Sequence, residues 1–388
     1  MSGIFHLPIG STTPKQGDKD YRIRFFDWDG TLLKTQWVYD SVDPSPPTTP
    51  NHPNLSFYGW NIDYITPTRN MDCGAIYTSV DSYINITLAT GTAKTITIYL
   101  SKVDATNTVI YWGDGTSNTL STAGNVSATR TYTDYGDYEI RIESVGYFFM
   151  GQGASLLGMF QNNMNQCVKS VIMGEKAVVA QYGFYNFTSM EKVIMSLNGT
   201  SIDHAFRGCW SLKHVNIPTA YTNIQTYAFN NNFALKNVIL NDAITAIGTY
   251  AFYNCYNLES IILPSSITSF GVYAFSEARS LKEINVQSSA ANIPSNFLQN
   301  AYTLKSIDFP DTISSFSSGP FPACYGLEEA IFRRTTPPTL ADTTTFQTYS
   351  TNKKLFKIYV PDASVTAYKS ATNWSPYANY IYPISERP

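Results

Sequence analysis

The sequence predicts a mainly β, modular protein in which two small β domains precede a solenoid of repeats with a C-terminal cap. Phenylalanines recur at nearly constant spacing from residue 160 to residue 346. Aromatic residues make up 14% of the chain, with 28 Tyr and 22 Phe, a composition that favours strands over helices. Before residue 150, short alternating segments are separated by turn residues, as in small antiparallel sheets.

We expect five segments along the 388 residues. Residues 1–20 are polar and contain Gly and Pro, which predicts an N-terminal arm. A small β domain covers 21–80 and a β-sandwich covers 81–149. The solenoid extends over 150–346, and residues 347–388 form its cap, because an open solenoid needs a lid over its last coil.

A hairpin is expected at the start of the first β domain. The stretch "RFFDWDGTLLKT", residues 24–35, alternates into Asp29-Gly30 and out again. Asp-Gly is a strong hairpin signal, because glycine readily takes the positive φ that such turns require. The prolines that follow, in "DPSPPTTPNHP", exclude a central strand or a helix there.

The same stretch resembles the nucleophile loop of haloacid-dehalogenase-type phosphatases. The resemblance would make Asp27 the nucleophile and Asp29 the acid and base. "GDGTSN" at 113–118 resembles the metal loop of that family, but Thr119 stands where a second acid is expected. Such enzymes need a parallel sheet with crossover helices, whereas residues 36–112 offer prolines and alternating strands. We therefore expect Asp27, Asp29 and Asp114 to be turn residues, with no enzymatic activity, cofactor or metal, and keep the phosphatase as a remote alternative.

Two further resemblances concern the β domains. "FFDWDGTLLKTQWV" followed by "FYGW" resembles the Listeria–Bacteroides β-repeat, also called the internalin B-type repeat, over residues 21–80. "WGDGT" at 112–116 and "TYTDYGDYEIRI" at 131–142 resemble a PKD-type immunoglobulin-like domain. Both families imply adhesion or display on surfaces, and neither is catalytic by itself.

The repeat block is the strongest pattern in the chain. Between the phenylalanines a frame such as "AFRGCWSLKHVNIP" recurs, and its L-x-x-V-x-I part predicts one strand per coil. Each coil buries its apolar face only by stacking on its neighbours, with the phenylalanines as a ladder. The phenylalanines are Phe160, Phe184, Phe206, Phe229, Phe252, Phe275, Phe297, Phe321 and Phe346.

The frames at 205–218 and 251–264, with the tail "KIYVPDASVTAYKSATNW", resemble the BspA-type leucine-rich repeats of bacterial surface antigens over about 155–388. In this block Cys209, Cys255 and Cys324 each follow a repeat Phe by three residues. Equivalent positions two coils apart lie roughly 10 Å from each other, beyond disulfide reach. We expect buried free thiols, and no zinc site, because the chain has no C-x-x-C pair and no Cys/His cluster.

Composition excludes some classes of partner. Charged residues are 14% of the chain and the net charge is −3, so no basic field is available for nucleic acid. No apolar run is long enough to predict a membrane span. The N-terminus lacks the pattern of a signal peptide, and none is expected.

Together these observations predict a non-enzymatic, surface-exposed binding or adhesion protein. The first hypothesis is a phage virion component on the virion surface, a capsid- or tail-attached fibre or decoration protein. Its arm would bind a capsid or tail protein, and its solenoid a glycan or protein of the host cell surface. The alternative is a bacterial cell-surface adhesin, or a secreted one. A homo-oligomer is possible.

A candidate binding surface follows from strand alternation, because residues between the inward ones of each repeat strand must point outward. In five of the eight coils one of these residues is an isoleucine, and stacked coils would join them into an apolar strip. Either the strip binds a partner or receptor, or the cap, a neighbouring module or a sister subunit covers it. The strip consists of Ile172, Ile194, Ile239, Ile262 and Ile331.

Overall fold

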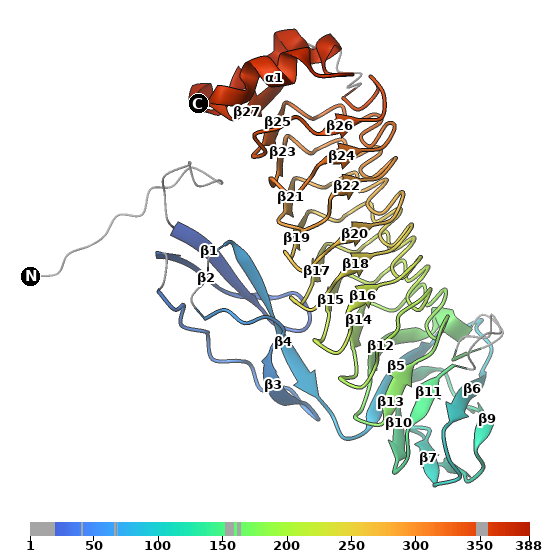
Figure 1. Cartoon of the computed structure of the whole chain (residues 1–388). Helices are drawn as coiled ribbons and strands as arrows, with labels where there is room; N and C mark the ends of the chain where they lie inside the picture. Colours follow the sequence, from blue (N-terminus) through green and yellow to red (C-terminus); the bar gives the residue numbers. More distant parts are fainter. Residues whose placement is uncertain are drawn as a thin grey trace, which may run out of the picture.

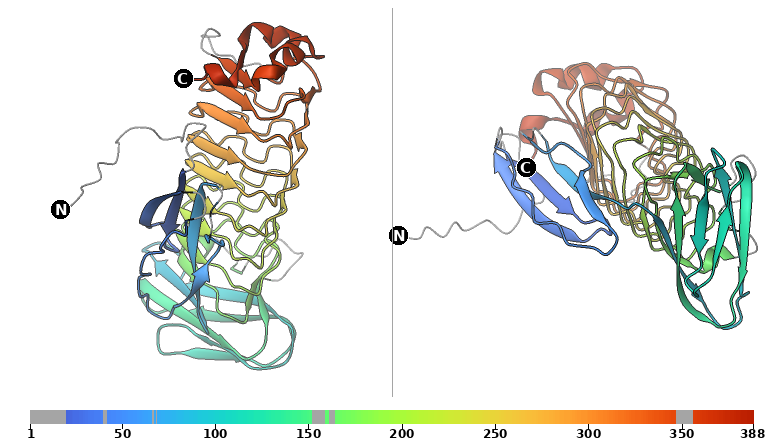
Figure 2. Two further views of the ribbon diagram at one scale, coloured as in Figure 1. Left: turned by 60° about the vertical axis from the view of Figure 1, so that its left-hand side comes forward. Right: turned by 90° about the horizontal axis from the view of Figure 1, so that it is seen from below.

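The structure, a computed structural model, describes residues 20–346 and 356–388, apart from residues 40, 41, 66, 68, 152–158 and 161–163. It is mainly β, as predicted, and the solenoid rises from the sandwich with the N-terminal sheet along one side (Figures 1 and 2). The predicted arm lies almost wholly outside the described residues.

The N-terminal sheet has four strands in the order β2-β1-β4-β3. The Asp-Gly turn joins β1 and β2 as an antiparallel hairpin, with Gly30 at a φ of +87°, and β1 also pairs in parallel with β4. Ile23, Phe25 and Cys73 are fully buried in its core. The strands are β1 (Asp20–Phe26), β2 (Leu32–Tyr39), β3 (Ser56–Trp60) and β4 (Met71–Thr78).

The next seven strands form two sheets, β5-β10-β7-β8 and β11-β6-β9. Trp112 is buried between them, and the hydroxyl of Tyr132 donates to its carbonyl at 2.8 Å. The strands are β5 (Ser82–Leu88), β6 (Thr95–Lys102), β7 (Thr108–Tyr111), β8 (Ser117–Leu120), β9 (Gly124–Thr131), β10 (Gly136–Ser144) and β11 (Phe148–Met150).

Both sandwich sheets continue into the solenoid. β12 (Val168–Ile172) pairs antiparallel with β5, and β13 (Ala177–Val179) pairs in parallel with β11. A single hydrophobic core extends without a break from Ile84 to Ile381. The sandwich therefore closes the first coil, so the edge of the array that would otherwise be open is paired.

The solenoid is built on one long parallel sheet, with two short rows of two-residue strands behind it. After η1 (Met164–Gln166), β14 (Lys192–Ile194) pairs with β12 and ends the sheet that continues from the sandwich. The long sheet consists of β15 (His214–Asn216), β17 (Asn237–Ile239), β19 (Ser260–Leu263), β21 (Glu283–Val286), β23 (Ser306–Phe309), β25 (Glu329–Phe332), β27 (Lys357–Val360) and β28 (Ile381–Pro383). The short rows are β16 (Asn223–Ile224), β18 (Ala246–Ile247) and β20 (Ser269–Phe270), then β22 (Asn292–Ile293), β24 (Ser315–Phe316) and β26 (Thr339–Leu340).

The expected phenylalanine ladder is present, with one change of register. From Phe184 to Phe275, ring centroids of successive coils lie 5.2–5.5 Å apart and the rings stack. Phe297 instead meets Phe275 edge-on, with the planes at 84°. Its carbonyl accepts from the Phe275 amide, the bond that an alanine carbonyl makes in earlier coils, so Leu298 occupies the ladder position. Equal spacing of phenylalanines thus concealed a one-residue shift in that coil.

The last coil is covered by η2 (Asp362–Ser364), α1 (Val365–Ser370), η3 (Ser375–Tyr380) and η4 (Ile384–Glu386). Trp374 packs edge-on against Phe332 and donates from its indole nitrogen to the Pro338 carbonyl at 2.8 Å. All five cysteines are buried and free, as expected for Cys209, Cys255 and Cys324. The thiols of Cys209 and Cys255 lie 3.2 and 3.3 Å from carbonyls of the preceding coil, and burial raises the pKa of both.

We predict that Phe252→Ala lowers the free energy of unfolding by about 3–5 kcal/mol, because it leaves a cavity in the middle of the ladder. The measurement is urea denaturation followed by circular dichroism. Tyr325→Ala removes a half-exposed ring from a later coil and serves as the control, with an expected loss below about 1 kcal/mol. Equal losses in the two variants would contradict the assignment of the ladder as core.

Candidate functional site

The five strip isoleucines point away from the solenoid core, as the predicted strand alternation requires. Ile172 pairs with Ile194, while Val171 and Val193, which precede them in the two strands, face inward and are buried. The strip is not contiguous, however. Asn216 stands beside Ile239, and Asn285 and Asp308 separate Ile262 from Ile331.

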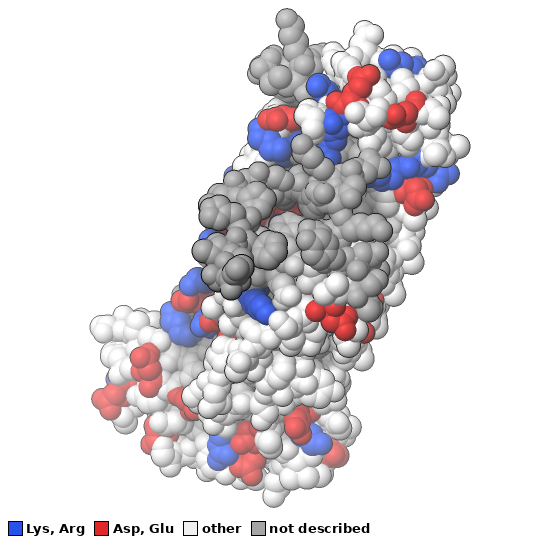
Figure 3. Space-filling view, turned by 90° about the vertical axis from the view of Figure 1, so that its left-hand side faces the viewer, with Lys and Arg blue, Asp and Glu red and all other residues white. Residues whose placement is uncertain are grey.

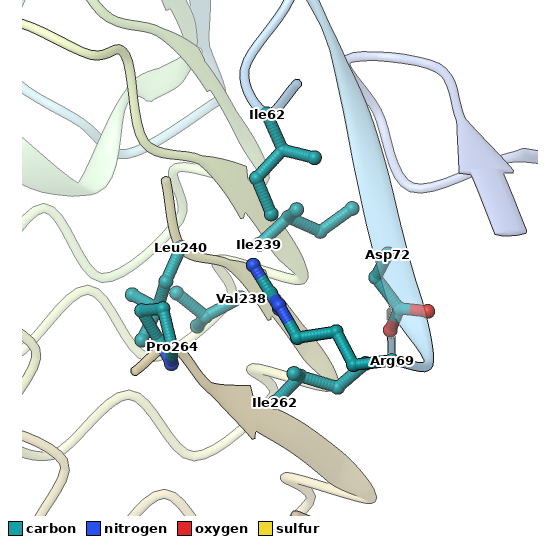
Figure 4. Close-up of a pocket in the computed structure, with 8 residues that line it drawn as sticks. All are labelled: Ile62, Arg69, Asp72, Val238, Ile239, Leu240, Ile262 and Pro264. Carbon is teal, nitrogen blue, oxygen red and sulfur yellow. The ribbon is translucent and has the colours of Figure 1, made fainter. Parts of the chain in front are cut away.

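The N-terminal sheet covers the part of the strip nearest the sandwich. β4 lies against β14, β15 and β17. Ile194 is only 5% exposed and packs with Ala75 and Tyr77 of β4. Ile239 is 3% exposed beside Ile62, at a gap of about 10 Å³ whose lining Figure 4 shows. Of the two alternatives for the strip, coverage by a neighbouring module matches the geometry here.

The other strip residues differ. Ile172 is half-buried at the edge of the Ala75–Tyr77 cluster, and Ile262 is half-buried at the gap beside Ile239. Ile331 is buried and pairs with Tyr359 of the last full coil. A partner-binding role for the strip stays a prediction.

A buried chain of hydrogen bonds crosses the interface between the N-terminal sheet and the solenoid. Nε2 of His214 lies 2.6 Å from Oδ1 of Asn216, whose amide nitrogen donates to the Ala75 carbonyl at 2.8 Å. Since Asn216 donates through its nitrogen, its oxygen accepts from His214, which fixes the Nε2–H tautomer of the imidazole. Asn61 adds a second link: its amide nitrogen donates to the Ile239 carbonyl at 3.1 Å, and its oxygen accepts from the Gly74 amide at 2.8 Å.

Two glycines allow this close approach. A Cβ on Gly74 would lie 2.5 Å from Cγ of Asn216, and one on Gly30 would lie 2.7 Å from Cγ of His214. No side chain fits at either position without moving the polar residues beneath it. The glycine of the "DWDG" turn is therefore needed twice, for its positive φ and for contact with the solenoid.

Ion pairs surround the buried contact. The guanidinium of Arg22 lies 3.2 Å from the Glu283 carboxylate, Lys192 lies 3.2 Å from Asp29, and Arg69 pairs with Asp242. Basic and acidic side chains lie intermixed on the visible part of this face (Figure 3). Exposed pairs contribute little energy individually, so we assign them to the alignment of the sheet on the solenoid.

The aspartates of the phosphatase-like motifs hold turns in the structure. The buried Asp27 carboxylate accepts from the Trp28 amide and lies 2.8 Å from Nε2 of His52. Asp29 accepts from the Thr31 amide at 3.0 Å and faces Lys192. Asp114 accepts from the Thr116 amide at 3.0 Å and pairs with Arg130 at 2.6 Å. Among the described residues no group of His, Cys, Asp and Glu could hold a metal ion.

Sequence reasoning missed a second row of aromatic side chains, four positions after the ladder in successive coils. Trp210 is 49% exposed, and Tyr302 and Tyr325 are 39% and 52% exposed. Trp210 and Phe233 lie 5.8 Å apart, Phe233 stacks on Tyr256 at 5.0 Å, and the Arg279 guanidinium lies 4.3 Å from the Tyr256 ring centre. The signal was available, since the position carries Trp210, Phe233, Tyr256, Arg279, Tyr302 and Tyr325.

We predict that Gly74→Ala releases the N-terminal sheet from the solenoid, because the new methyl group cannot coexist with the Asn216 side chain. Hydrogen exchange of the peptide covering β4 should become faster, while exchange in the solenoid coils beyond β21 stays unchanged. Gly91→Ala is the control: Gly91 has a φ of +90°, so alanine adds backbone strain there, but nothing lies within 4 Å of its Cβ and exchange of β4 should not change. Unchanged exchange of β4 in Gly74→Ala would contradict the contact.

The contact between the N-terminal sheet and the solenoid, here called docking, should also weaken in acid. Burial lowers the pKa of His214 from 6.5 to about 4, although Asn216 and the carboxylates of Asp29, Asp27 and Asp72 oppose the shift. Nδ1 of His214 has no partner among the described residues, so a proton there would be buried without an acceptor. A base with a depressed pKa in the docked state binds more protons when released, so docking loses stability as the pH falls from about 6.5 to about 4.

We predict for this pH window a difference between the native chain and His214→Gln, which cannot titrate. Hydrogen exchange of β4, corrected for its intrinsic pH dependence, should rise more steeply towards pH 4 in the native chain. Parallel profiles would show that His214 does not control docking.

Among the described residues no helix is long and apolar enough to cross a membrane. Comparison with curated proteins finds no similar sequence. Solved leucine-rich repeat structures are similar to parts of this chain, all with low TM-scores. A leucine-rich repeat protein of T. pallidum has 21% identity and a TM-score of 0.33, with 42% of this chain and 72% of that chain covered. One from Bacteroides ovatus has 16% identity and a TM-score of 0.35, with coverage of 55% and 66%.

A leucine-rich cell surface protein of Faecalibacterium prausnitzii has 19% identity and a TM-score of 0.25, with 60% of this chain and 86% of that chain covered. The family description "BspA type Leucine rich repeat region" matches residues 177–303 in 6 copies. That range contains the stacked coils from β13 to β22. Residues 177–303 therefore form a BspA-type leucine-rich repeat region.

Proposed function

We propose that this chain is a non-enzymatic binding protein displayed on an outer surface, and that the aromatic row is its main contact with a partner. The proposal rests on the aromatic row, because the row does not contribute to the core of the coils. The buried ladder and the repeat leucines already fill that core. Trp, Tyr and Arg are the residues that dominate binding energy at protein interfaces. At about 4.8 Å per coil, the row from Trp210 to Tyr325 extends over roughly 25 Å.

The rest of the fold supports this role by making the row rigid. The sandwich sheets continue into the first coils, and buried hydrogen bonds attach the N-terminal sheet to the next ones. A surface held in one geometry loses little conformational freedom when it binds. In this proposal the strip residues Ile194 and Ile239 serve as the internal docking surface.

Two settings remain for the proposed function. In the first, the protein is a phage virion component, a fibre or decoration protein whose N-terminal arm, residues 1–20, attaches to a capsid or tail protein. In the second, it is a bacterial cell-surface or secreted adhesin, a setting supported by the BspA-type region. Partners in either setting are a glycan or protein of a cell surface, with a possible homo-oligomer. Gold-labelled antibody against the solenoid, applied to purified phage particles and to intact bacteria, distinguishes the two.

We predict that replacing Trp210, Tyr302 and Tyr325 together by alanine reduces saturable binding of the labelled chain to target cells by at least about tenfold, because each is a candidate hot spot. Flow cytometry over a panel of bacterial and epithelial cells provides the measurement. The control replaces Tyr135 and Phe149, exposed aromatics of the sandwich, by alanine and should bind normally. Absence of saturable binding by the native chain, or undiminished binding by the triple variant, would overturn the proposal.

A further inference from the structure

A cleft of about 370 Å³ opens where the three β modules meet. The N-terminal sheet contributes Tyr58 and the end of β4, the sandwich contributes Tyr147, and the solenoid contributes residues 173–176 and 195–198. Two narrower gaps between the N-terminal sheet and the outer face of the solenoid hold only about 10 Å³ each, so the two modules pack closely at those points. The volume of the cleft lies within the range typical of small-ligand sites, about 300–1,000 Å³.

Tyrosine rings form the apolar part of the cleft. Tyr58 is 67% exposed, so its ring is available to a ligand. Tyr77 is buried, with its hydroxyl 3.2 Å from the Pro50 carbonyl, and is fixed in place. Tyr147 carries the Lys176 ammonium 4.8 Å above its ring, which positions the only cation of the lining.

Polar groups of known position complete the lining. The Glu175 amide donates to the Ser79 carbonyl at 2.9 Å, and the Asn198 side chain donates to the Glu175 carbonyl at 2.6 Å. These bonds join the N-terminal sheet to two solenoid coils and hold both residues at the cleft. Both are exposed, and among the described residues no ion pair includes the Glu175 carboxylate.

We propose that this cleft binds a neutral saccharide unit. Sugar hydroxyls both donate and accept hydrogen bonds, and the lining offers a carboxylate acceptor, an ammonium donor and an amide that does both. The C–H face of a sugar ring suits the exposed ring of Tyr58. One acid and one base give a lining with no net charge, which favours a neutral ligand over an anionic one.

A peptide strand fits the cleft less well than a saccharide. Strand addition needs an unpaired sheet edge. At the end of β4, Thr78 already pairs with Ser56, and the carbonyl of Ser79 is occupied by Glu175. The cleft is separate from the aromatic row, so it adds a second site to the proposed function.

The probes are tetrasaccharides of glucose, mannose, galactose and N-acetylglucosamine, with a sialylated tetrasaccharide and an extended peptide for comparison. Saturation-transfer NMR and titration calorimetry on the full chain should show saturable binding of at least one neutral probe at millimolar concentration. Tyr58→Ala and Asn198→Ala should each weaken it by about tenfold, which corresponds to about 1.4 kcal/mol. Tyr58 is exposed, so thermal melting of Tyr58→Ala should match that of the native chain and separate lost binding from lost folding.

Tyr135→Ala, which changes an exposed aromatic residue of the sandwich outside both proposed sites, is the matched control and should leave sugar affinity unchanged. Failure of every neutral probe to bind, preference for the sialylated or peptide probe, or full affinity in Tyr58→Ala would each overturn the saccharide site. Cell binding through the aromatic row is measured separately, so its persistence after such a result would leave the proposed function standing.

Discussion

The outer face of the solenoid's parallel sheet must be covered where it is apolar, and this constraint shapes the molecule. Isoleucines of neighbouring coils lie side by side there in places, as Ile172 and Ile194 do, and burying one of them is worth on the order of 2 kcal/mol. The N-terminal sheet supplies the cover, with Ala75 and Tyr77 over Ile194 and with Ile62 beside Ile239. Burial alone would permit many orientations of one sheet on another, because apolar contact is not directional.

Asn216 selects one orientation. The side-chain amide of Asn216 is buried, and a buried amide lowers stability unless its hydrogen bonds are made. Asn216 makes its bonds to the Ala75 carbonyl and to His214 only when Ala75 lies directly above it. The glycines at positions 30 and 74 exist at the same contact because nothing larger fits over this pair. The cleft beside Tyr58 follows from the same placement, since the docked sheet forms one of its walls.

Local patterns predicted much of this architecture. The Phe period and the strand alternation gave the coils and the direction of each strip residue, and Asp29-Gly30 gave the hairpin. The one-residue shift at Phe297 was not predicted, because in this coil a phenylalanine stands one position before the ladder position and keeps the spacing of phenylalanines nearly constant. Contacts distant in sequence were also missed: the pairing of β5 with β12, of Asp27 with His52, and of the hairpin with His214. Such contacts depend on how modules meet, and no local periodicity encodes that.

The most direct test of the account is the distance between the N-terminal sheet and the solenoid in solution. Spin labels at Leu32→Cys in β2 and Val272→Cys on the solenoid occupy exposed positions, and the five native cysteines are buried, so labelling is confined to the new sites. Double electron–electron resonance at neutral pH should give one narrow distance distribution. A broad or multiple distribution would show that the sheet is not held on the outer face, and would contradict the account.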